Sequence, residues 1–561
     1  MKGPDFAVRG FEFCDHSRFQ TGMWRGKMLD RALALMRQLD FNTLIFHQND
    51  LSDWVSRPRA YFPPALSRAR WPVRYANVEN GKSHLREVIR KAGEQGAQFF
   101  LEVKEMSFPE ELLEVHPEVM VVKGTPCPTH PFWWDFIRAK YREIVEDLPG
   151  LGGVIVSAGT RESKLSLAVH ACPCERCRNY APSDWYVNIV RAIHEPLQAR
   201  GKTLVVRDFA YDRSEQNLVV DACSRVSERI VVALKNTPHD FYPPFPDNPR
   251  IGTVGRHPQW IEFDAWCQFS GMGFIPVSVA GDIQRRLRHA RALGAIGAMW
   301  RVDLELISDA SVFNSLNLVN VFAAGILARN VDEPLDNIYD AWLAYGIADH
   351  LKPESEQPPP CPIVPAERGR FRRFMEASWN AVVKSLYVRG FIFTDGTCQF
   401  PFSVDHAFFV MLTFQGRDDW EPGASRRIAP TAENVEAVLR EKHEAEAEVA
   451  ALPGVLGLET LTLPENLRAS YRQLLSLYQL YVRGLTRCCA ACFRTRRAQV
   501  TRAPADVDAA LRAAAELAAY GDEVERRLQG TYYPHYVYWY FDLGYLRRLA
   551  ADAQAKAAAL T

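Results

Sequence analysis

An alternation of short β-type runs with amphipathic helices through the first 300 residues constrains the fold more than any other feature. Apolar residues at three-to-four spacing predict helices, for example over 28–39, 84–96, 133–148 and 282–294. The runs predicted as strands are 7–13, 43–49, 98–104, 153–159, 203–209, 230–236, 260–266 and 295–301. Eight such units predict an α/β fold, a (β/α)8 TIM barrel, because the alternative, a doubly wound sheet, seldom needs eight. Residues 273–279 could form a ninth strand.

The chain is predicted to have three parts: a barrel over 1–350, a Pro-rich connector over 351–369 and an α-helical C-terminal domain over 370–561. The connector contains six prolines and cannot be a continuous helix, because proline lacks the backbone N–H that a helix needs. Long helices are expected near 432–450, 465–498, 505–528 and 531–560. The aromatic run TYYPHYVYWYFDLGYL is interpreted as packing against the barrel or a second subunit.

Composition excludes several classes of partner. Lys+Arg and Asp+Glu both number 67, so the basic excess that usually accompanies nucleic-acid or membrane-surface binding is missing. No run of 18 apolar residues and no signal-peptide pattern is found, so we expect a cytoplasmic protein whose 12 cysteines are reduced thiols, apart from any that bind metal. Neither a dinucleotide nor a P-loop fingerprint is present, and no catalytic cofactor is expected.

Polar side chains gather where the predicted strands end, which is where (β/α)8 barrels place their chemistry. These candidate residues are His47, Asp50, Lys104, Arg161, Glu162, Arg207, Lys235, Asp240, Glu262, Asp264, Gln268, Trp300 and Arg301. Carboxylates for acid/base work, cations for an anionic substituent and an indole to stack on a pyranose suit a sugar-acid substrate. The alternative is a network of ion pairs that plugs the barrel end. Glu262 and Asp264 share one strand face, which points either into the barrel or out of it.

Four stretches carry a family resemblance: PFWWDFIRAKYREIVEDLPGLGGVIVSAGTRES (131–163), VVRDFAYD (205–212), LKNTPHDFYPPFPDNPRIG (234–252) with QWIEFDAWCQFSG (259–271), and FNSLNLVNVFAAGILARNVDEPLDNIYDAW (313–342). They resemble, in order, the acid-bearing, strand-end, catalytic and barrel-closing segments of the α-glucuronidases of glycoside hydrolase family 67. The resemblance covers roughly residues 1–345. It implies hydrolysis of uronic-acid-containing oligosaccharides, and the family's helical C-terminal domain suggests a homodimer by analogy.

The resemblance also implies roles for single residues. The family's general acid falls on Glu162, one of its candidate bases on Asp240, and its substrate-carboxylate cations on Arg207 and Lys235. An inverting reaction would need about 6.5–9.5 Å between the two carboxyl groups, against about 5–5.5 Å for a retaining one.

Two departures from the family pattern leave alternatives open. A second candidate base aligns with Gln268, which cannot take a proton at neutral pH. A lysine that precedes the family's acid aligns with Ser157, and Arg161 could replace it. A hydrolase for a neutral or amino sugar, and a barrel that binds carbohydrate without cleaving it, therefore remain alternatives.

The segment HACPCERCRN (170–179) concentrates metal-binding residue types. His170, Cys172, Cys174 and Cys177 could hold a structural zinc ion in the loop after the fourth strand. The alternative is a cluster of reduced cysteines packed within the loop. Cys488, Cys489 and Cys492 lie in a helical pattern and are expected to be small buried residues.

Overall fold

The computed structural model places most of the chain. The described residues are 3–14, 27–52, 54–122, 124–167, 170, 172–209, 213–304, 311–352, 357–394, 398–414 and 416–561.

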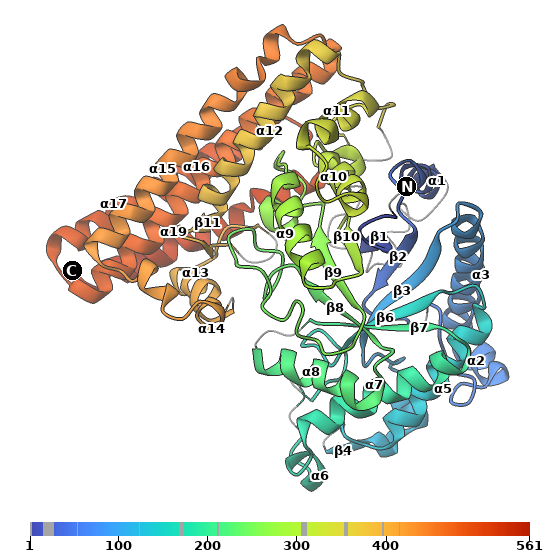
Figure 1. Ribbon diagram of the computed structural model, residues 1–561. Coiled ribbons are helices and arrows are strands. Elements are labelled where there is room, and N and C mark those ends of the chain that lie inside the picture. The colour runs from blue at the N-terminus through green and yellow to red at the C-terminus, as the bar shows by residue number, and fades with distance from the viewer. Residues whose placement is uncertain are drawn as a thin grey trace.

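Eight parallel strands within these described residues close into one barrel (Figure 1). They are β1 (Val8–Cys14), β2 (Thr43–Gln48), β3 (Gln98–Glu105), β6 (Gly153–Ala158), β7 (Thr203–Arg207), β8 (Val231–Lys235), β9 (Gln259–Asp264) and β10 (Gly297–Arg301). Each strand pairs with the next barrel strand along the chain, and β10 closes the barrel on β1. The predicted (β/α)8 barrel followed by a helical C-terminal region is confirmed.

Helices connect the strands and cover the outside of the barrel. The longer ones are α1 (Lys27–Gln38), α2 (Pro64–Arg70), α3 (Pro72–Glu94), α5 (Phe132–Asp147), α7 (Pro182–Ala199), α8 (Arg213–Val226), α9 (Ala280–Ala292) and α10 (Leu318–Arg329). Short elements lie between them: α4 (Leu112–Val115), the strand pair β4 (Met120–Val122) and β5 (Thr125–Pro126), and α6 (Glu175–Arg178). Apolar positions at helical spacing explain the packing, since α3 buries Leu85, Val88 and Ala92.

The connection from β8 to β9 contains no helix, although the alternation predicts one there. Residues 236–258 form turns and irregular backbone instead, because five prolines interrupt the segment between 238 and 249. Arg286 of α9 holds this loop from beneath. Its buried guanidinium donates to the carbonyl oxygens of Asn236 at 3.2 Å and Phe245 at 2.9 Å, and to the Asp247 carboxylate at 2.9 Å.

The ninth strand expected over 273–279 does not form. The segment is buried without a strand partner, and asparagine side chains take the place of a ladder. Asn317 accepts from the backbone N–H of Val277 at 2.9 Å, and Asn320 accepts from that of Val279 at 2.8 Å. An apolar run can therefore be buried as irregular backbone when side chains supply its hydrogen bonds.

Long helices pack side by side beyond the barrel (Figure 1). The helices of this region are α11 (Leu335–Tyr345), α12 (Pro365–Leu386), α13 (Val404–Phe409), α14 (Arg417–Trp420), α15 (Ala432–Leu456), α16 (Glu465–Thr501), α17 (Pro504–Leu528), α18 (His535–Tyr540) and α19 (Leu543–Ala558), with a small hairpin of β11 (Tyr387–Val388) and β12 (Phe391–Ile392). Residues 357–364 are non-helical, as the prolines predict, and 353–356 lie outside the described residues. Helix α12 begins at Pro365, inside the predicted connector, because proline fits the first helical turn.

Two further sequence expectations concern these helices. Cys488, Cys489 and Cys492 are fully buried in α16, as predicted. None of the helices in the described part of the chain is both long enough and apolar enough to cross a membrane.

Tyrosine hydroxyl groups from the helical region hold the barrel loop that follows β9. Tyr387 donates to the carbonyl oxygen of Phe269 at 2.5 Å. Tyr540, from the aromatic run, donates to the carbonyl oxygens of Gly271 and Met272, both at 2.7 Å. The aromatic run therefore packs against the barrel, which was one of its two interpretations.

We expect Tyr540→Phe to lower the free energy of unfolding by about 1–3 kcal/mol, because two buried carbonyl groups lose a hydrogen-bond donor. Urea denaturation followed by tryptophan fluorescence would measure the change. Tyr532→Phe is the matched control, since the Tyr532 side chain is 94% exposed. Equal stability of the two variants would contradict this role for the Tyr540 hydroxyl.

Candidate active site

The inside of the barrel is apolar at one level and charged at the next. The apolar level consists of Ile45, Phe100, Ile155, Val205, Val231, Ala233, Trp260 and Met299. Because side chains alternate along a strand, residues two positions further on also point inward. These inward positions are His47, Glu102, Ser157, Arg207, Lys235, Glu262 and Arg301, and Glu12 lies beside Arg301 in the register of β1 and β10.

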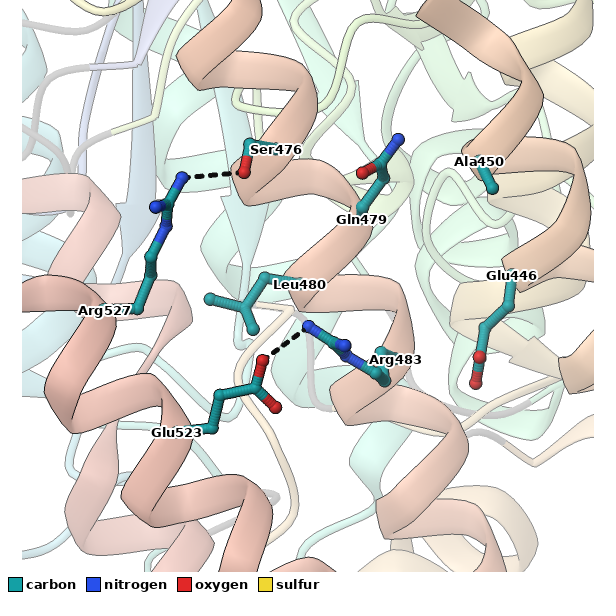
Figure 2. Close-up of a pocket in the computed structure, with 8 residues that line it drawn as sticks. All are labelled: Glu446, Ala450, Ser476, Gln479, Leu480, Arg483, Glu523 and Arg527. Carbon is teal, nitrogen blue, oxygen red and sulfur yellow. Dashed lines mark hydrogen bonds and ion pairs between the residues drawn. The ribbon is translucent and has the colours of Figure 1, made fainter.

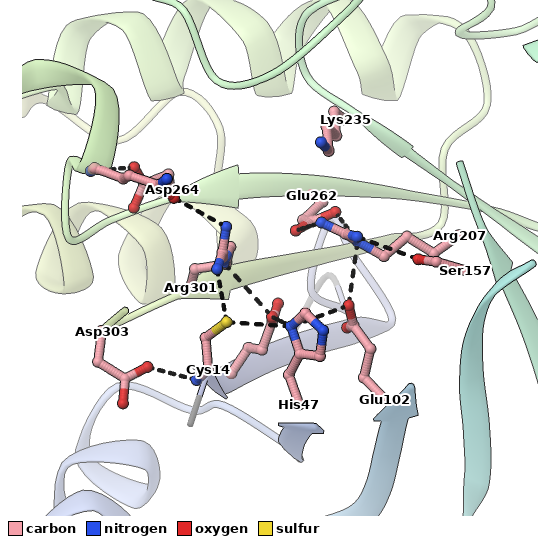
Figure 3. A network of polar contacts seen from close by, with 12 residues as sticks. Cys14, His47, Glu102, Ser157, Arg207, Lys235, Glu262, Asp264, Arg301 and Asp303 are labelled. Carbon is pink, nitrogen blue, oxygen red and sulfur yellow. Dashed lines mark hydrogen bonds and ion pairs between the residues drawn. The ribbon is translucent and has the colours of Figure 1, made fainter. Parts of the chain in front are cut away.

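Arg207 is the centre of the charged level (Figure 3). Its guanidinium donates to the two carboxylate oxygens of Glu262 at 2.6 and 2.7 Å and lies 3.2 Å from Glu102. Burial opposes the charged form, but these carboxylates outweigh it and raise the pKa of Arg207 above its usual value. Only 1% of the side chain is exposed. Arg207 therefore binds carboxylates of the protein itself, and the predicted contact with a substrate carboxylate does not fit this arrangement.

His47 and Arg301 belong to the same buried network. The Nδ1 atom of His47 lies 3.4 Å from Glu102 and 3.5 Å from Glu12, and 3.2 Å from the sulfur of Cys14. Arg301 donates to that sulfur at 2.6 Å. Both side chains are buried and bind other members of the network.

The network buries more carboxylates than guanidinium groups. Glu12, Glu102 and Glu262 face two cations, Arg207 and Arg301, and an unbalanced buried charge is costly. Burial raises the pKa of Glu12 well above its usual value and, against the opposing effect of Arg207, raises the pKa of Glu102 to about 7. A proton retained by these carboxyl groups near neutral pH balances the charge.

Two ion pairs lie around the ring of Phe209 at the mouth of the barrel. The ammonium groups of Lys104 and Lys235 lie 5.0 and 3.9 Å from the ring centre. Lys104 pairs with Glu162, whose side chain is 42% exposed, and Lys235 pairs with Asp240, which is 17% exposed. The structure thus brings the two carboxylates expected to do acid/base chemistry, from the loops after β6 and β8, to the same end of the barrel.

The electrostatic surroundings of Asp240 keep its carboxylate ionised. Burial alone would raise its pKa, but the Lys235 ammonium outweighs this and holds the pKa at about 2. Burial lowers the pKa of Lys235. It also lowers the pKa of His239, to about 4. Asp240 is therefore a charged, partly exposed acceptor at neutral pH, as a group that activates water must be.

The side chains of Glu262 and Asp264 lie on the strand face that points into the barrel, one of the two orientations that the sequence left open. Glu262 is fully committed to Arg207. Asp264 accepts from the backbone N–H of Cys267 at 2.9 Å and contacts that of Gln268, and burial raises its pKa to about 6. The Gln268 side chain accepts from Arg301 at 3.1 Å. Asp264 thus organises the loop after β9.

Arg161 and Asp50 lie at the rim. Arg161 is 50% exposed and lies 3.9 Å from Glu215, so it is an accessible cation next to Glu162. Asp50 accepts from the backbone N–H of Ser52 at 2.6 Å, the usual arrangement in an Asx turn. Arg161 remains a candidate for binding an anionic substituent, whereas Asp50 shapes its own loop.

The predicted sugar-stacking role of Trp300 is wrong. Its ring is fully buried and packs against Phe41 at 5.8 Å and Phe263 at 5.6 Å. Arg301 points into the barrel, so its neighbour must point out. The half-buried aromatic ring at the mouth is Phe209, which the sequence analysis did not single out although it follows Arg207 at the inward spacing of two.

The cysteine cluster has a different fourth member from the one predicted. The sulfurs of Cys172, Cys174 and Cys177 lie together with that of Cys127, all within 4.8 Å of one another. The ring of His170 instead accepts from the backbone N–H of Ser166 at 3.0 Å. Cys127 therefore takes the place expected for His170.

A cavity of about 390 Å³ lies elsewhere, among the helices α15, α16 and α17 (Figure 2). Polar side chains that line it bind each other: Arg483 lies 2.8 Å from Glu523, and Arg527 donates to the Ser476 hydroxyl at 2.8 Å. The ion pairs at the barrel mouth, by contrast, surround one half-buried aromatic ring, that of Phe209.

Comparisons with known proteins agree with the fold. No family model matches the chain, and no curated protein matches its sequence. A solved glycoside hydrolase of family 138, described as targeting pectin rhamnogalacturonan II, is similar with a TM-score of 0.66 and 13% identity over 100% of this chain and 85% of that one. The O-GlcNAc hydrolase of Thermobaculum terrenum, solved as a mutant, aligns with a TM-score of 0.43 and 11% identity over 99% and 94%. At such identities the first likeness shows a shared fold.

The raised pKa of Glu102 predicts a pH-dependent stability. The folded protein holds this proton more tightly than the unfolded chain, so the free energy of unfolding should fall as pH rises from about 4.5 to 7, by on the order of 3 kcal/mol. Glu102→Gln should flatten this slope, measured by urea denaturation at several pH values. Glu114→Gln, at a side chain that is 53% exposed, should leave the slope unchanged. A slope unaffected by Glu102→Gln would contradict the assignment.

Proposed function

We propose that the protein is a glycoside hydrolase that cleaves uronic-acid-containing oligosaccharides at the C-terminal end of its barrel. One observation carries the proposal: Glu162 and Asp240, on separate loops, each pair with a lysine that lies against the ring of Phe209. Acid, base, cations and a stacking surface are the components that hydrolysis of a charged sugar requires. The fold likeness to a hydrolase described as targeting a pectin polysaccharide adds support.

In the proposed reaction Glu162 protonates the glycosidic oxygen and Asp240 activates a water molecule for attack from the opposite side of the sugar. This division of roles gives inversion, for which a carboxyl separation of about 6.5–9.5 Å is expected. The greater exposure of Glu162 suits a group that must reach the leaving group. Phe209 supplies the face on which the sugar ring stacks, and the exposed Arg161 binds the anionic substituent.

A second candidate is hydrolysis of a neutral or amino sugar by the same carboxylates. The internal pairing of Arg207 favours it, because a cation expected to bind the uronate is engaged by Glu262. A third candidate is binding without hydrolysis, which is favoured by the presence of the Gln268 amide at the position of the family's second candidate base. Wild-type protein incubated with aldouronic oligosaccharides separates the first case from the third: release of an inverted uronic acid, followed by NMR, supports the first, and tight binding without turnover supports the third.

We expect Glu162→Gln to lower kcat by about 10²–10⁴-fold on oligosaccharides, whose leaving groups need protonation, and far less on aryl glycosides with good leaving groups. Initial rates on both substrate types would measure this split. Glu110→Gln is the control, since Glu110 is 78% exposed on a neighbouring loop. Undiminished oligosaccharide turnover by Glu162→Gln would remove Glu162 from the role of acid.

Arg161→Gln should raise KM for uronic-acid substrates about tenfold while leaving KM for neutral sugars unchanged, because only the charged substituent loses a partner. Steady-state kinetics on paired uronic and neutral substrates would show the difference. Arg200→Gln is a suitable control, because Arg200 follows α7 at the opposite end of the barrel and is 56% exposed. An equal rise in KM for both substrates would argue against recognition of the carboxylate by Arg161.

A further inference from the structure

Two loops that follow neighbouring strands of the barrel, β3 and β6, meet at a cluster of four cysteines. Cys127 lies after the β4–β5 pair and before α5. Cys174 caps the start of α6, Cys177 lies in its only turn, and Cys172 lies two residues before Cys174. Figure 1 shows β4 and α6 near each other at the lower end of the molecule. Residues distant in the chain thus converge outside the barrel.

The spacing of the sulfur atoms suits a tetrahedral metal ion. The sulfur of Cys127 lies 3.4 Å from that of Cys177 and 3.7 Å from that of Cys174. Four sulfurs at about 2.3 Å from a zinc ion form a tetrahedron with edges of about 3.8 Å. All four sulfurs lie within 4.8 Å of one another, so a small contraction places them around one ion.

Hydrogen-bonding groups surround three of the four sulfurs. The backbone N–H of Cys177 donates to the sulfur of Cys174 at 3.4 Å, the contact expected within a C-x-x-C turn that binds metal. The hydroxyl of Thr129 lies 3.1 Å from the sulfur of Cys177 and 3.4 Å from that of Cys127.

Two buried tryptophans fix the position of Cys127. The indole N–H of Trp133 donates to the carbonyl oxygen of Cys127 at 2.8 Å, and that of Trp185 donates to the carbonyl oxygen of Pro128 at 2.9 Å. Both indoles are fully buried. The buried core of the helical layer therefore holds Cys127 in place, and the C-x-C-x-x-C segment (172–177) lies against it.

We propose that Cys127, Cys172, Cys174 and Cys177 bind one zinc ion as four thiolate ligands. Four soft sulfur ligands select zinc over the harder cations, and a complete set of protein ligands leaves no position for substrate, so the ion is structural. It ties the loop after β6, which carries Glu162, to the loop after β3. The site stands on its own geometry and does not depend on the proposed hydrolase activity.

Metal analysis of the purified full-length protein tests the ligand set. Wild-type protein should contain one zinc per chain, and Cys127→Ser should lose most of it. His170→Ala should keep its zinc, because that ring binds the backbone of Ser166. Cys361→Ser, at a partly exposed cysteine outside the cluster, is the control for loss of any single thiol. Zinc retained by Cys127→Ser, or lost by His170→Ala, would overturn the ligand set.

A second measurement covers the case in which Cys127→Ser fails to fold. Removal of zinc from wild-type protein by a chelator should make four further thiols reactive and lower the melting temperature, and added zinc should reverse both changes. Cobalt in place of zinc should give the intense visible bands of tetrahedral thiolate coordination. Wild-type protein with no bound metal, with stoichiometric iron in place of zinc, or without the cobalt bands would overturn the proposal.

Discussion

The pairing of Arg207 with Glu262 and Glu102 inside the barrel is the interaction on which the candidate site depends. It joins β7, β9 and β3 across the barrel through groups that water does not reach. Removing one partner would leave an uncompensated buried charge, a far larger cost than the loss of a surface pair. Lys104 and Asp264 each stand two residues beyond a member of this network. Their positions at the mouth are therefore set by the ion pairs beneath them.

The helical C-terminal region completes the mouth from outside. Arg417 donates to the carbonyl oxygen of Pro244 at 3.0 Å, in the loop that carries Asp240. The thiol of Cys398 donates to the carbonyl oxygen of Gln268 at 3.2 Å. With the tyrosine contacts to the loop after β9, these bonds hold two active-end loops that contain little regular structure of their own. The geometry of the proposed base thus depends on helices more than 150 residues away in the chain.

The sequence predicted the strands well because most of them contain a short run of apolar, β-branched or aromatic residues, and the barrel follows from their number. It missed Glu12 and Glu102, although a carboxylate in the middle of an apolar strand is itself a signal of a buried polar network. It also placed both Trp300 and Arg301 at the mouth, which strand alternation forbids. No spacing rule could have joined Cys127 to the cysteines some 45 residues later, because only the packing of two loops brings them together.

The ion pairs at the mouth suggest how recognition and chemistry are linked in the proposed enzyme. Lys104 pairs with Glu162, and Lys235 with Asp240, so a substrate carboxylate that approaches either lysine competes with the protein's own carboxylate for the same ammonium group. A uronate that binds Lys104 would release the Glu162 side chain from this ion pair, so that it can turn toward the glycosidic oxygen. A neutral sugar makes no such exchange. Discrimination between charged and neutral substrates through Lys104 would therefore appear in kcat, since the charged substituent would release the Glu162 side chain from its ion pair as well as hold the sugar ring.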